Sequence, residues 1–238
     1  MIWMRKNKLL TIVGGVTALL FISLTISIKT SAIWLQTLDT AVQNLIAPVV
    51  NPVATKYISL IAVLGSPFID ICWTILIAFL LWRKERNLIN AGWLLITQFS
   101  GCAVALIIKE LVHRSRPANQ VIKNGGFSFP SGHTFATAIV VLAVLYFIVP
   151  WLQDQELQFV ISLLSIGWVI LIGFTRLYLR AHFFSDVCGS LLLAITWWEV
   201  MKLFYFRFWG KMFSNEWRKL RKGKNFSNIR NDILYSIN

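Results

Sequence analysis

Long apolar runs, separated by short polar or basic stretches, make up most of this 238-residue chain. A helix that crosses a bilayer needs about 20 mostly apolar residues, and six segments of the chain come close to that length. We expect these helices at residues 9–28, 68–82, 88–112, 132–149, 157–178 and 183–206. The pattern therefore predicts an all-α integral membrane protein with six transmembrane helices.

The composition agrees with a membrane protein. Hydrophobic residues account for 57% of the chain and charged residues for 14%, whereas about 25% of the residues in an average soluble domain are charged. The mean hydropathy is +0.66. The net charge of +13 is concentrated at residues 5–8, 83–86 and 207–230, beside apolar runs. Such clusters are typical of cytoplasmic loops, so we expect no nucleic-acid partner.

The same charges predict the orientation of the chain. Basic residues at both ends and in the loop at residues 83–86 favour the cytoplasmic side, and six spans place both termini there. The loop at residues 150–156 lacks Lys and Arg and gives no support. A cleaved signal peptide is an alternative for the first span, with a possible cleavage region at residues 30–32. Its apolar length of about 20 residues favours a retained anchor in the cell membrane.

The segment between the first two spans has apolar residues at helical spacing. Trp34, Leu35, Leu38, Val42, Leu45 and Ile46 form this pattern, with Asp39 and Gln43 falling elsewhere. We expect an interfacial amphipathic helix here, broken by Pro48 and Pro52. The predicted organisation is one membrane domain over residues 1–209, followed by a basic cytoplasmic tail over residues 210–238.

Three charged clusters lie at the predicted outer ends of the spans. In the first, Lys109 and Arg116 are seven residues apart, so both project from one face at the end of a helix. Two cations on one face suit an anion, and snorkelling to the lipid headgroups is the alternative. His113, Arg114 and Lys123 belong to the same outer loop and are expected to be exposed.

The second cluster opens the span at residues 132–149. Ser131 is placed to cap the helix, and the N–H groups of the first turn form a natural cradle for phosphate. Gly132 lets an oxyanion approach the backbone closely, and His133 is placed to protonate a leaving oxygen. The alternative is an ordinary helix start with a histidine at the membrane interface.

The third cluster joins His182 and Asp186, four residues apart, with Arg176 at the end of the preceding span. A carboxylate at this spacing can accept the ring N–H of His182 and make the other ring nitrogen more nucleophilic. Arg176 can grip a phosphate with two N–H groups. A purely structural His–Asp pair is the alternative. Together, the three clusters hold what phosphoryl transfer needs: cations, N–H groups, a nucleophile and an acid.

These motifs resemble those of the type 2 phosphatidic acid phosphatase superfamily. Its first motif is Lys, six residues, then Arg-Pro, which matches Lys109 to Pro117. The second, Pro-Ser-Gly-His, matches residues 130–133. The third is Arg, five residues, His, three residues, Asp, which matches Arg176 to Asp186. The motif core thus covers residues 109–186, and the plan of six spans extends the resemblance over most of the chain.

The resemblance implies roles for these residues. His182 attacks phosphorus and becomes a phosphohistidine, Asp186 supports it, and His133 protonates the leaving group. The phosphoryl oxygens are held by Lys109, Arg116, Ser131, Gly132 and Arg176. No metal and no cofactor are implied. The chain departs from the family pattern at Thr175, where relatives often have Ser, and at Arg180 and Phe184, where they often have Gly and Pro.

The expected activity is dephosphorylation of a membrane lipid by a site that faces outward. Undecaprenyl pyrophosphate is the first choice of substrate, and phosphatidylglycerol phosphate is close behind. A lipid phosphotransferase with the same site remains open, because another acceptor can replace water. A transporter of anionic lipids would use the cations but gives His133, His182 and Asp186 no role. A catalytically silent scaffold would not need the complete set of motif residues. The sequence does not indicate an oligomeric state.

Overall fold

The computed structural model describes residues 2–85 and 88–223, and every regular element in this part of the chain is a helix. The α-helices are α1 (Ile2–Lys29), α2 (Ile33–Ile46), α3 (Pro52–Leu64), α4 (Pro67–Glu85), α5 (Leu88–Val112), α6 (Gly132–Ala143), α7 (Gln155–Tyr178) and α8 (Phe184–Gly223). A 3-10 turn, Ala47–Val49, follows α2. A π-helical turn, Val144–Ile148, and a 3-10 turn, Val149–Trp151, follow α6. The all-α prediction is confirmed.

The chain forms two compact units, Met1–Glu199 and Val200–Asn238. All the predicted site residues lie in the first unit. The helix α8 remains helical to Gly223, so the predicted boundary between residues 209 and 210 is not marked by the end of a helix. Residues 224–238 of the predicted tail lie outside the described part of the chain.

Polar residues set several of the helix starts. The side chain of Asn51 accepts a hydrogen bond from the Ala54 N–H at 2.9 Å, and Pro52 occupies the first position of α3. The side chain of Asp154 accepts from the Glu156 N–H at 2.8 Å at the start of α7. Both caps satisfy backbone donors that have no partner within their own helix.

Five of the described helices are long and apolar enough to cross a membrane. They are α1, α5, α6 with the turns that follow it, α7 and α8. The helix α4 does not qualify, because Asp70 stands in its first turn and Arg83 and Lys84 in its last, although it packs against α5 and α6. The bent pair formed by α2 and α3 would raise the number to six if it counted as one span. The protein is thus an all-helical membrane protein, and the count of six spans that includes residues 68–82 stays a prediction.

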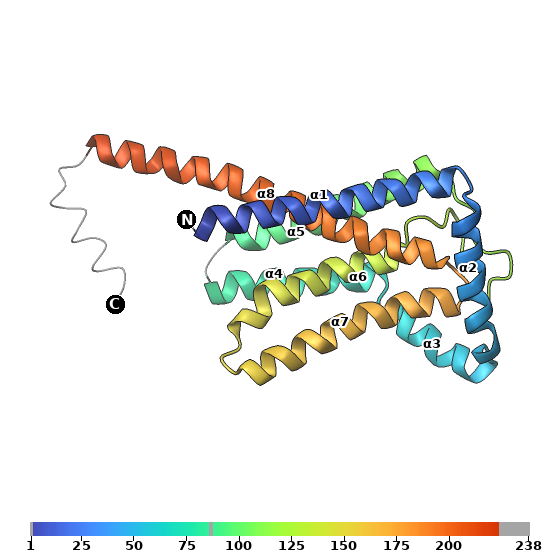
Figure 1. The fold of residues 1–238 in the computed structure, drawn as a ribbon. Helices are drawn as coiled ribbons and strands as arrows, with labels where there is room; N and C mark the ends of the chain where they lie inside the picture. Colours follow the sequence, from blue (N-terminus) through green and yellow to red (C-terminus); the bar gives the residue numbers. More distant parts are fainter. Residues whose placement is uncertain (1, 86–87, 224–238) are drawn as a thin grey trace. The chain divides into compact units, whose positions relative to one another are not determined.

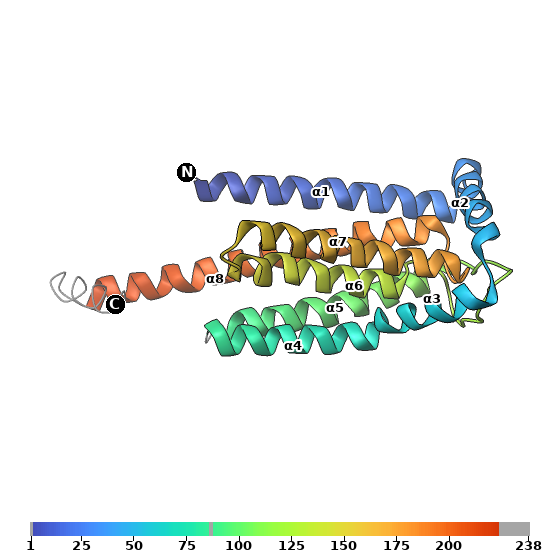
Figure 2. The same ribbon diagram turned by 90° about the horizontal axis from the view of Figure 1, so that it is seen from below.

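The segment after α1 is helical, as expected, and turns sharply. The helices α2 and α3 meet at an angle of 119°, beside the two prolines that were predicted to break the segment. Figures 1 and 2 show α2 lying across the end of the bundle at which α1 ends. The position of α2 at a membrane interface stays a prediction.

The polar residue Asp39 of α2 faces the protein. Asp39 is buried, with 3% of its surface exposed, whereas Ile33, Trp34 and Leu45 are 82%, 58% and 79% exposed. The carboxylate of Asp39 turns inward because Arg114 and Ser185 bind it. Leu35 is buried beside Asp39, with 2% of its surface exposed, so α2 presents both a polar and an apolar side chain to the protein while other apolar side chains face outward.

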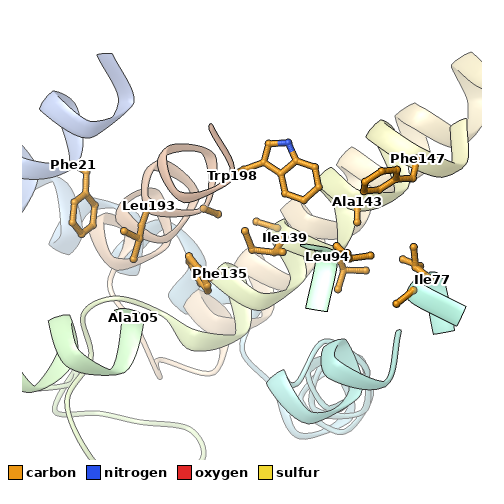
Figure 3. Packing of buried hydrophobic residues seen from close by; sticks show 14 of the residues in the cluster. Phe21, Ile77, Leu94, Ala105, Phe135, Ile139, Ala143, Phe147, Leu193 and Trp198 are labelled. Atoms are coloured by element: carbon orange, nitrogen blue, oxygen red, sulfur yellow. The ribbon is translucent and has the colours of Figure 1, made fainter. Parts of the chain in front are cut away.

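The apolar core of the first unit is built around α6. Phe135 and Ile139 of α6 are almost fully buried and belong to one cluster with side chains of α1, α4, α5 and α8 (Figure 3). Gly101 of α5 permits this packing, because a Cβ there would lie 2.8 Å from both the Phe135 ring and the Trp197 ring. Small residues at helix contacts are typical of membrane bundles. The packing fixes α6, whose first turn carries the Pro-Ser-Gly-His motif.

Candidate active site

The three predicted clusters meet at one end of the bundle. There α5 ends at Val112 and α6 begins at Gly132, while α7 ends at Tyr178 and α8 begins at Phe184. Figure 1 shows these helix ends and the long connection between α5 and α6 on the same side, next to α2. The predicted gathering of the clusters at one end of the helices is therefore observed.

The imidazole of His182 is buried and held at both ring nitrogens. Only 2% of the residue is exposed. Its Nδ1 lies 2.7 Å from the carbonyl oxygen of Ser128, and its Nε2 lies 3.3 Å from Nη1 of Arg116. A carbonyl can only accept, so Nδ1 carries the proton and Nε2 keeps its lone pair. Burial lowers the pKa of His182 to about 4, opposed by Asp186, and Nε2 is thereby a free base at neutral pH.

Asp186 supports this histidine from beside it. Its Oδ2 lies 3.6 Å from His182 Nδ1, beyond hydrogen-bond distance, so the expected acceptor of the ring N–H is replaced by the Ser128 carbonyl. The same Oδ2 accepts the N–H of Phe183 at 2.9 Å. His182 itself precedes α8, so the two residues do not stack on one helix face. Asp186 instead caps the start of α8 and places a negative charge next to the ring.

Three cations surround the imidazoles. Arg116 donates from Nη1 to the Ala181 carbonyl at 2.7 Å, and burial lowers the pKa of its guanidinium. Lys109 donates to the Phe127 carbonyl at 2.8 Å. Arg176 is 4% exposed, and its Nε is buried with no hydrogen-bond partner in the described part of the chain. All three lie within electrostatic range of His133. An unsatisfied buried donor among clustered cations suits an anionic ligand.

The Pro-Ser-Gly-His motif forms the first turn of α6. The side chain of Ser131 caps the helix and accepts a hydrogen bond from the Thr134 hydroxyl at 3.1 Å. The N–H of Ser131 donates to Ser190 Oγ at 2.7 Å, and Ser190 Oγ donates to the Asp186 carbonyl at 2.7 Å. The second and third motifs are thus joined through one buried hydroxyl.

Gly132 and His133 stand at the open side of this turn. Both are partly exposed, and a Cβ on Gly132 would meet only Pro67 Cγ, at 3.8 Å. Packing against the described residues therefore does not require a glycine here. The first N–H groups of a helix have no partner within it and attract anions.

The comparisons with known proteins agree with these motifs. A family model described as the PAP2 superfamily matches residues 88–209, just over half of the chain. The chain belongs to the PAP2 superfamily. This is the superfamily of type 2 phosphatidic acid phosphatases that the three motifs resemble, and the resemblance is confirmed.

One curated relative is phosphatidylglycerophosphatase B of Bacillus subtilis (strain 168). It is 31% identical over 102 residues, which cover 41% of this chain and 49% of the relative. The chain therefore matches about half the length of this relative. The PAP2 motifs at residues 109–186 lie inside the family match.

Two solved structures share the fold. The crystal structure of a transmembrane PAP2-type phosphatidylglycerolphosphate phosphatase from Bacillus subtilis has a TM-score of 0.73 and 23% identity, and the match covers 82% of this chain and 96% of that one. Aquifex aeolicus LpxE has a TM-score of 0.54 and 21% identity, with 68% and 94% covered. The PAP2 fold thus extends over most of the chain.

Two residues that the sequence left outside the site belong to it. Arg114 was expected to be exposed, yet its side chain is only 14% exposed and donates to Asp186 Oδ1 at 2.6 Å. Ser128 contributes its carbonyl to His182. His113 and Lys123 are exposed, as expected. Arg114 lies within the first PAP2 motif, two residues before Arg116, but only contacts across 72 residues reveal its partner.

No three His, Cys, Asp or Glu side chains lie close enough to hold a metal ion within the described residues. The groups that meet at the site are two imidazoles, one carboxylate next to a ring, three cations and a helix start. These groups can bind a phosphate, attack its phosphorus and protonate a leaving oxygen.

Proposed function

We propose that this chain is a metal-independent membrane lipid phosphatase that works through a phosphohistidine at His182. The geometry of this ring carries the proposal. With Nδ1 donating to the Ser128 carbonyl at 2.7 Å, the lone pair of Nε2 faces the cations that would hold a phosphate. A buried neutral imidazole with a nearby carboxylate is an activated nucleophile. Membership of the PAP2 superfamily supports the same activity.

The first chemical step is attack on phosphorus. A bond forms from His182 Nε2 to phosphorus while the bond from phosphorus to the leaving oxygen breaks. His133 gives its proton to that oxygen. The ring of His182 then carries positive charge, which Asp186 stabilises from 3.6 Å. The Nδ1 proton stays on the bond to Ser128 throughout.

The second step releases phosphate. Water bonds to phosphorus as the bond from phosphorus to Nε2 breaks, and His133 takes the proton from the water. Lys109, Arg116 and Arg176 hold the phosphoryl oxygens in both steps, together with Ser131 and the backbone N–H of Gly132. The buried Nε of Arg176, which has no hydrogen-bond partner among the described residues, would gain a partner from a phosphate.

The proposed substrates are phosphatidylglycerol phosphate and undecaprenyl pyrophosphate. The name of the relative that is 31% identical, phosphatidylglycerophosphatase B, supports the first. The proposed contacts are with phosphate alone and do not choose between lipid tails. We place the protein in the plasma membrane with both termini in the cytoplasm and the site on the outer face, because the basic clusters favour the inside.

The test is phosphate release by the detergent-purified protein in the presence of EDTA. Wild type and His182→Ala are compared on both lipids, with His113→Ala as the matched control, because His113 is exposed. We expect release by wild type and the control and none by His182→Ala. Rapid denaturation at alkaline pH, which preserves the acid-labile bond from phosphorus to nitrogen, should yield a phosphorylated protein only where His182 is present.

Three results would contradict the proposal in different ways. Activity that EDTA abolishes would replace the metal-free mechanism. A phosphorylated lipid or alcohol as product, in place of inorganic phosphate, would indicate a phosphotransferase. No release from either lipid, with transport of anionic lipid in liposomes that His182→Ala leaves intact, would indicate a transporter.

A further inference from the structure

A single guanidinium joins two buried carboxylates behind the active site. Arg114 donates from Nη1 to Asp186 Oδ1 at 2.6 Å and from Nη2 to Asp39 Oδ2 at 2.7 Å. The side chains of Asp39 and Asp186 are 4% and 0% exposed. The ring of Phe183 covers the guanidinium, with its centre 4.3 Å from the Arg114 Cζ atom. The bridge therefore lies mostly out of reach of water.

A second set of contacts ties the same parts together. Asp39 Oδ1 accepts the N–H of Ser185 at 2.9 Å, and Asp39 Oδ2 accepts the Ser185 hydroxyl at 2.7 Å. Arg114 Nη1 also donates to the Ser185 hydroxyl at 2.7 Å. Asp39 belongs to α2, so a carboxylate from a distant helix caps the first turn of α8. Negative charge at a helix start is favourable.

The bridge is not suited to binding phosphate. Both terminal nitrogens of Arg114 are engaged by Asp39, Asp186 and Ser185. By contrast, Nε of Arg176 has no partner within residues 2–85 and 88–223. A buried ion pair also adds little to stability on balance, because removing the charges from water offsets the attraction. What the bridge does provide is geometry: the fork of Arg114 fixes one oxygen of Asp186, which leaves the other directed at the Phe183 N–H and the His182 ring.

We propose that Arg114 is a positioning residue for the histidine nucleophile. Asp39 holds Arg114 in place, so that α2 is part of the catalytic framework. This inference rests on the proposed phosphatase function. Arg114 orients Asp186, and Asp186 supports the charge that His182 gains during attack. Asp39 holds the other side of the guanidinium and thereby sets its direction.

The test measures kcat and KM for phosphate release by Arg114→Gln, Arg114→Lys, Asp39→Asn and the double variant Arg114→Gln/Asp39→Asn. Lys123→Gln is the matched control, because it removes an exposed cation from the same loop. We expect Arg114→Gln to lower kcat about 10- to 100-fold, the usual effect of losing a partner that orients a reactive group. KM should change by less than about threefold, since Arg114 does not face the phosphate.

The other variants separate positioning from folding. Arg114→Lys should restore part of kcat, and Asp39→Asn alone should cost less than Arg114→Gln because the contact with Asp186 remains. In Arg114→Gln two buried carboxylates lose their shared cation. The double variant removes one of these charges, so it should be more active than Arg114→Gln alone. If the two substitutions only damaged the fold in general, the decreases in kcat of the two single variants would multiply in the double variant instead.

Several results would overturn the inference. A normal kcat in Arg114→Gln, a loss confined to KM, or multiplicative losses in the double variant would each do so. Should Arg114→Gln fail to elute as a folded protein, Asp39→Asn decides, and a kcat equal to that of wild type overturns the proposal. An inactive wild type would instead reject the phosphatase function itself, whereas an active wild type with unaffected variants rejects only the role of Arg114 and Asp39.

Discussion

The Nδ1 atom of His182 lies 2.7 Å from the carbonyl oxygen of Ser128. Ser128 is itself fixed, because its N–H donates to the Arg114 carbonyl at 2.8 Å and its hydroxyl donates to the Ser115 carbonyl at 3.0 Å. The proposed nucleophile, which lies between α7 and α8, is therefore oriented by the connection between α5 and α6. The protonated nitrogen follows from this contact, because a carbonyl oxygen accepts and never donates.

Buried His182 should make the protein less stable in mild acid. Its pKa is about 4 in the folded chain and about 6.5 in an unfolded one, so the unfolded state binds more protons between these values. Stability is full above pH 6.5 and is lost as the pH falls towards 4. Thermal unfolding at pH 7.5 and pH 5 should show wild type losing about 2 kcal/mol more than His182→Asn. Equal losses in both proteins would contradict a buried neutral ring.

Arg116 should be needed for phosphate affinity, and a lysine at this position should not restore that affinity. Its Nη1 faces His182 Nε2 at 3.3 Å, where the phosphoryl group is proposed to bind. Arg116→Lys keeps the charge but loses the planar fork. Inhibition of turnover by inorganic phosphate should weaken about 10-fold, the effect of one hydrogen bond to a charged group. Lys123→Gln should leave the inhibition constant unchanged, and an unchanged constant in Arg116→Lys would refute the prediction.

Replacing Arg180 with glycine should stabilise the folded protein. The φ angle of Arg180 is 50°, in the left-handed region that costs a side-chain-bearing residue about 1–2 kcal/mol. Arg180→Gly should raise the free energy of unfolding by about 1 kcal/mol over Arg180→Ala, which removes the same charge but keeps the strain. Thermal midpoints in detergent measure the difference, and equal midpoints would argue against strain at this position.

Gly189 should be intolerant of alanine. A Cβ there would lie 2.4 Å from Phe129 Cε2, and Phe129 directly precedes the Pro-Ser-Gly-His motif. Gly189→Ala should lower stability by about 1–3 kcal/mol, as overpacking does, and should also lower kcat by displacing the first turn of α6. Gly167→Ala is the matched control, because a Cβ there meets nothing within 4 Å. Full activity in Gly189→Ala would show that the Phe129 ring can shift without displacing the Pro-Ser-Gly-His motif.

Much of the fold followed from local signals. The bounds of α5, the start of α6 and the end of α7 lie where the apolar runs and the motifs place them. The cap Ser131 precedes α6 and marks its start. The helix α5 ends at Val112, five residues before Pro117, so the expectation that Lys109 and Arg116 project from one helix face is wrong. Sequence is informative where the cause of a boundary lies within a few residues of it.

Arg114 was misplaced for the opposite reason, and its pairing with Asp39 was not predicted. Their contact joins residues 75 positions apart, and the apolar stripe on α2 does not show which side of the helix is buried. In a membrane protein the outward face can be apolar, so the stripe does not identify the buried side. The carbonyl of Ser128 was missed because a backbone group carries no signal of its own in the sequence.

The packing around Phe129 has a consequence for how related chains can vary. Its ring stacks on Phe21 of α1, with centres 5.7 Å apart, and fills the space that the missing side chain of Gly189 leaves on α8. Positions 21, 129 and 189 thus share one volume although they are far apart in the sequence. Evolutionary change at one of them should be matched by opposite changes in size at the others, and this covariation would connect the first helix of the chain to the phosphate-binding turn.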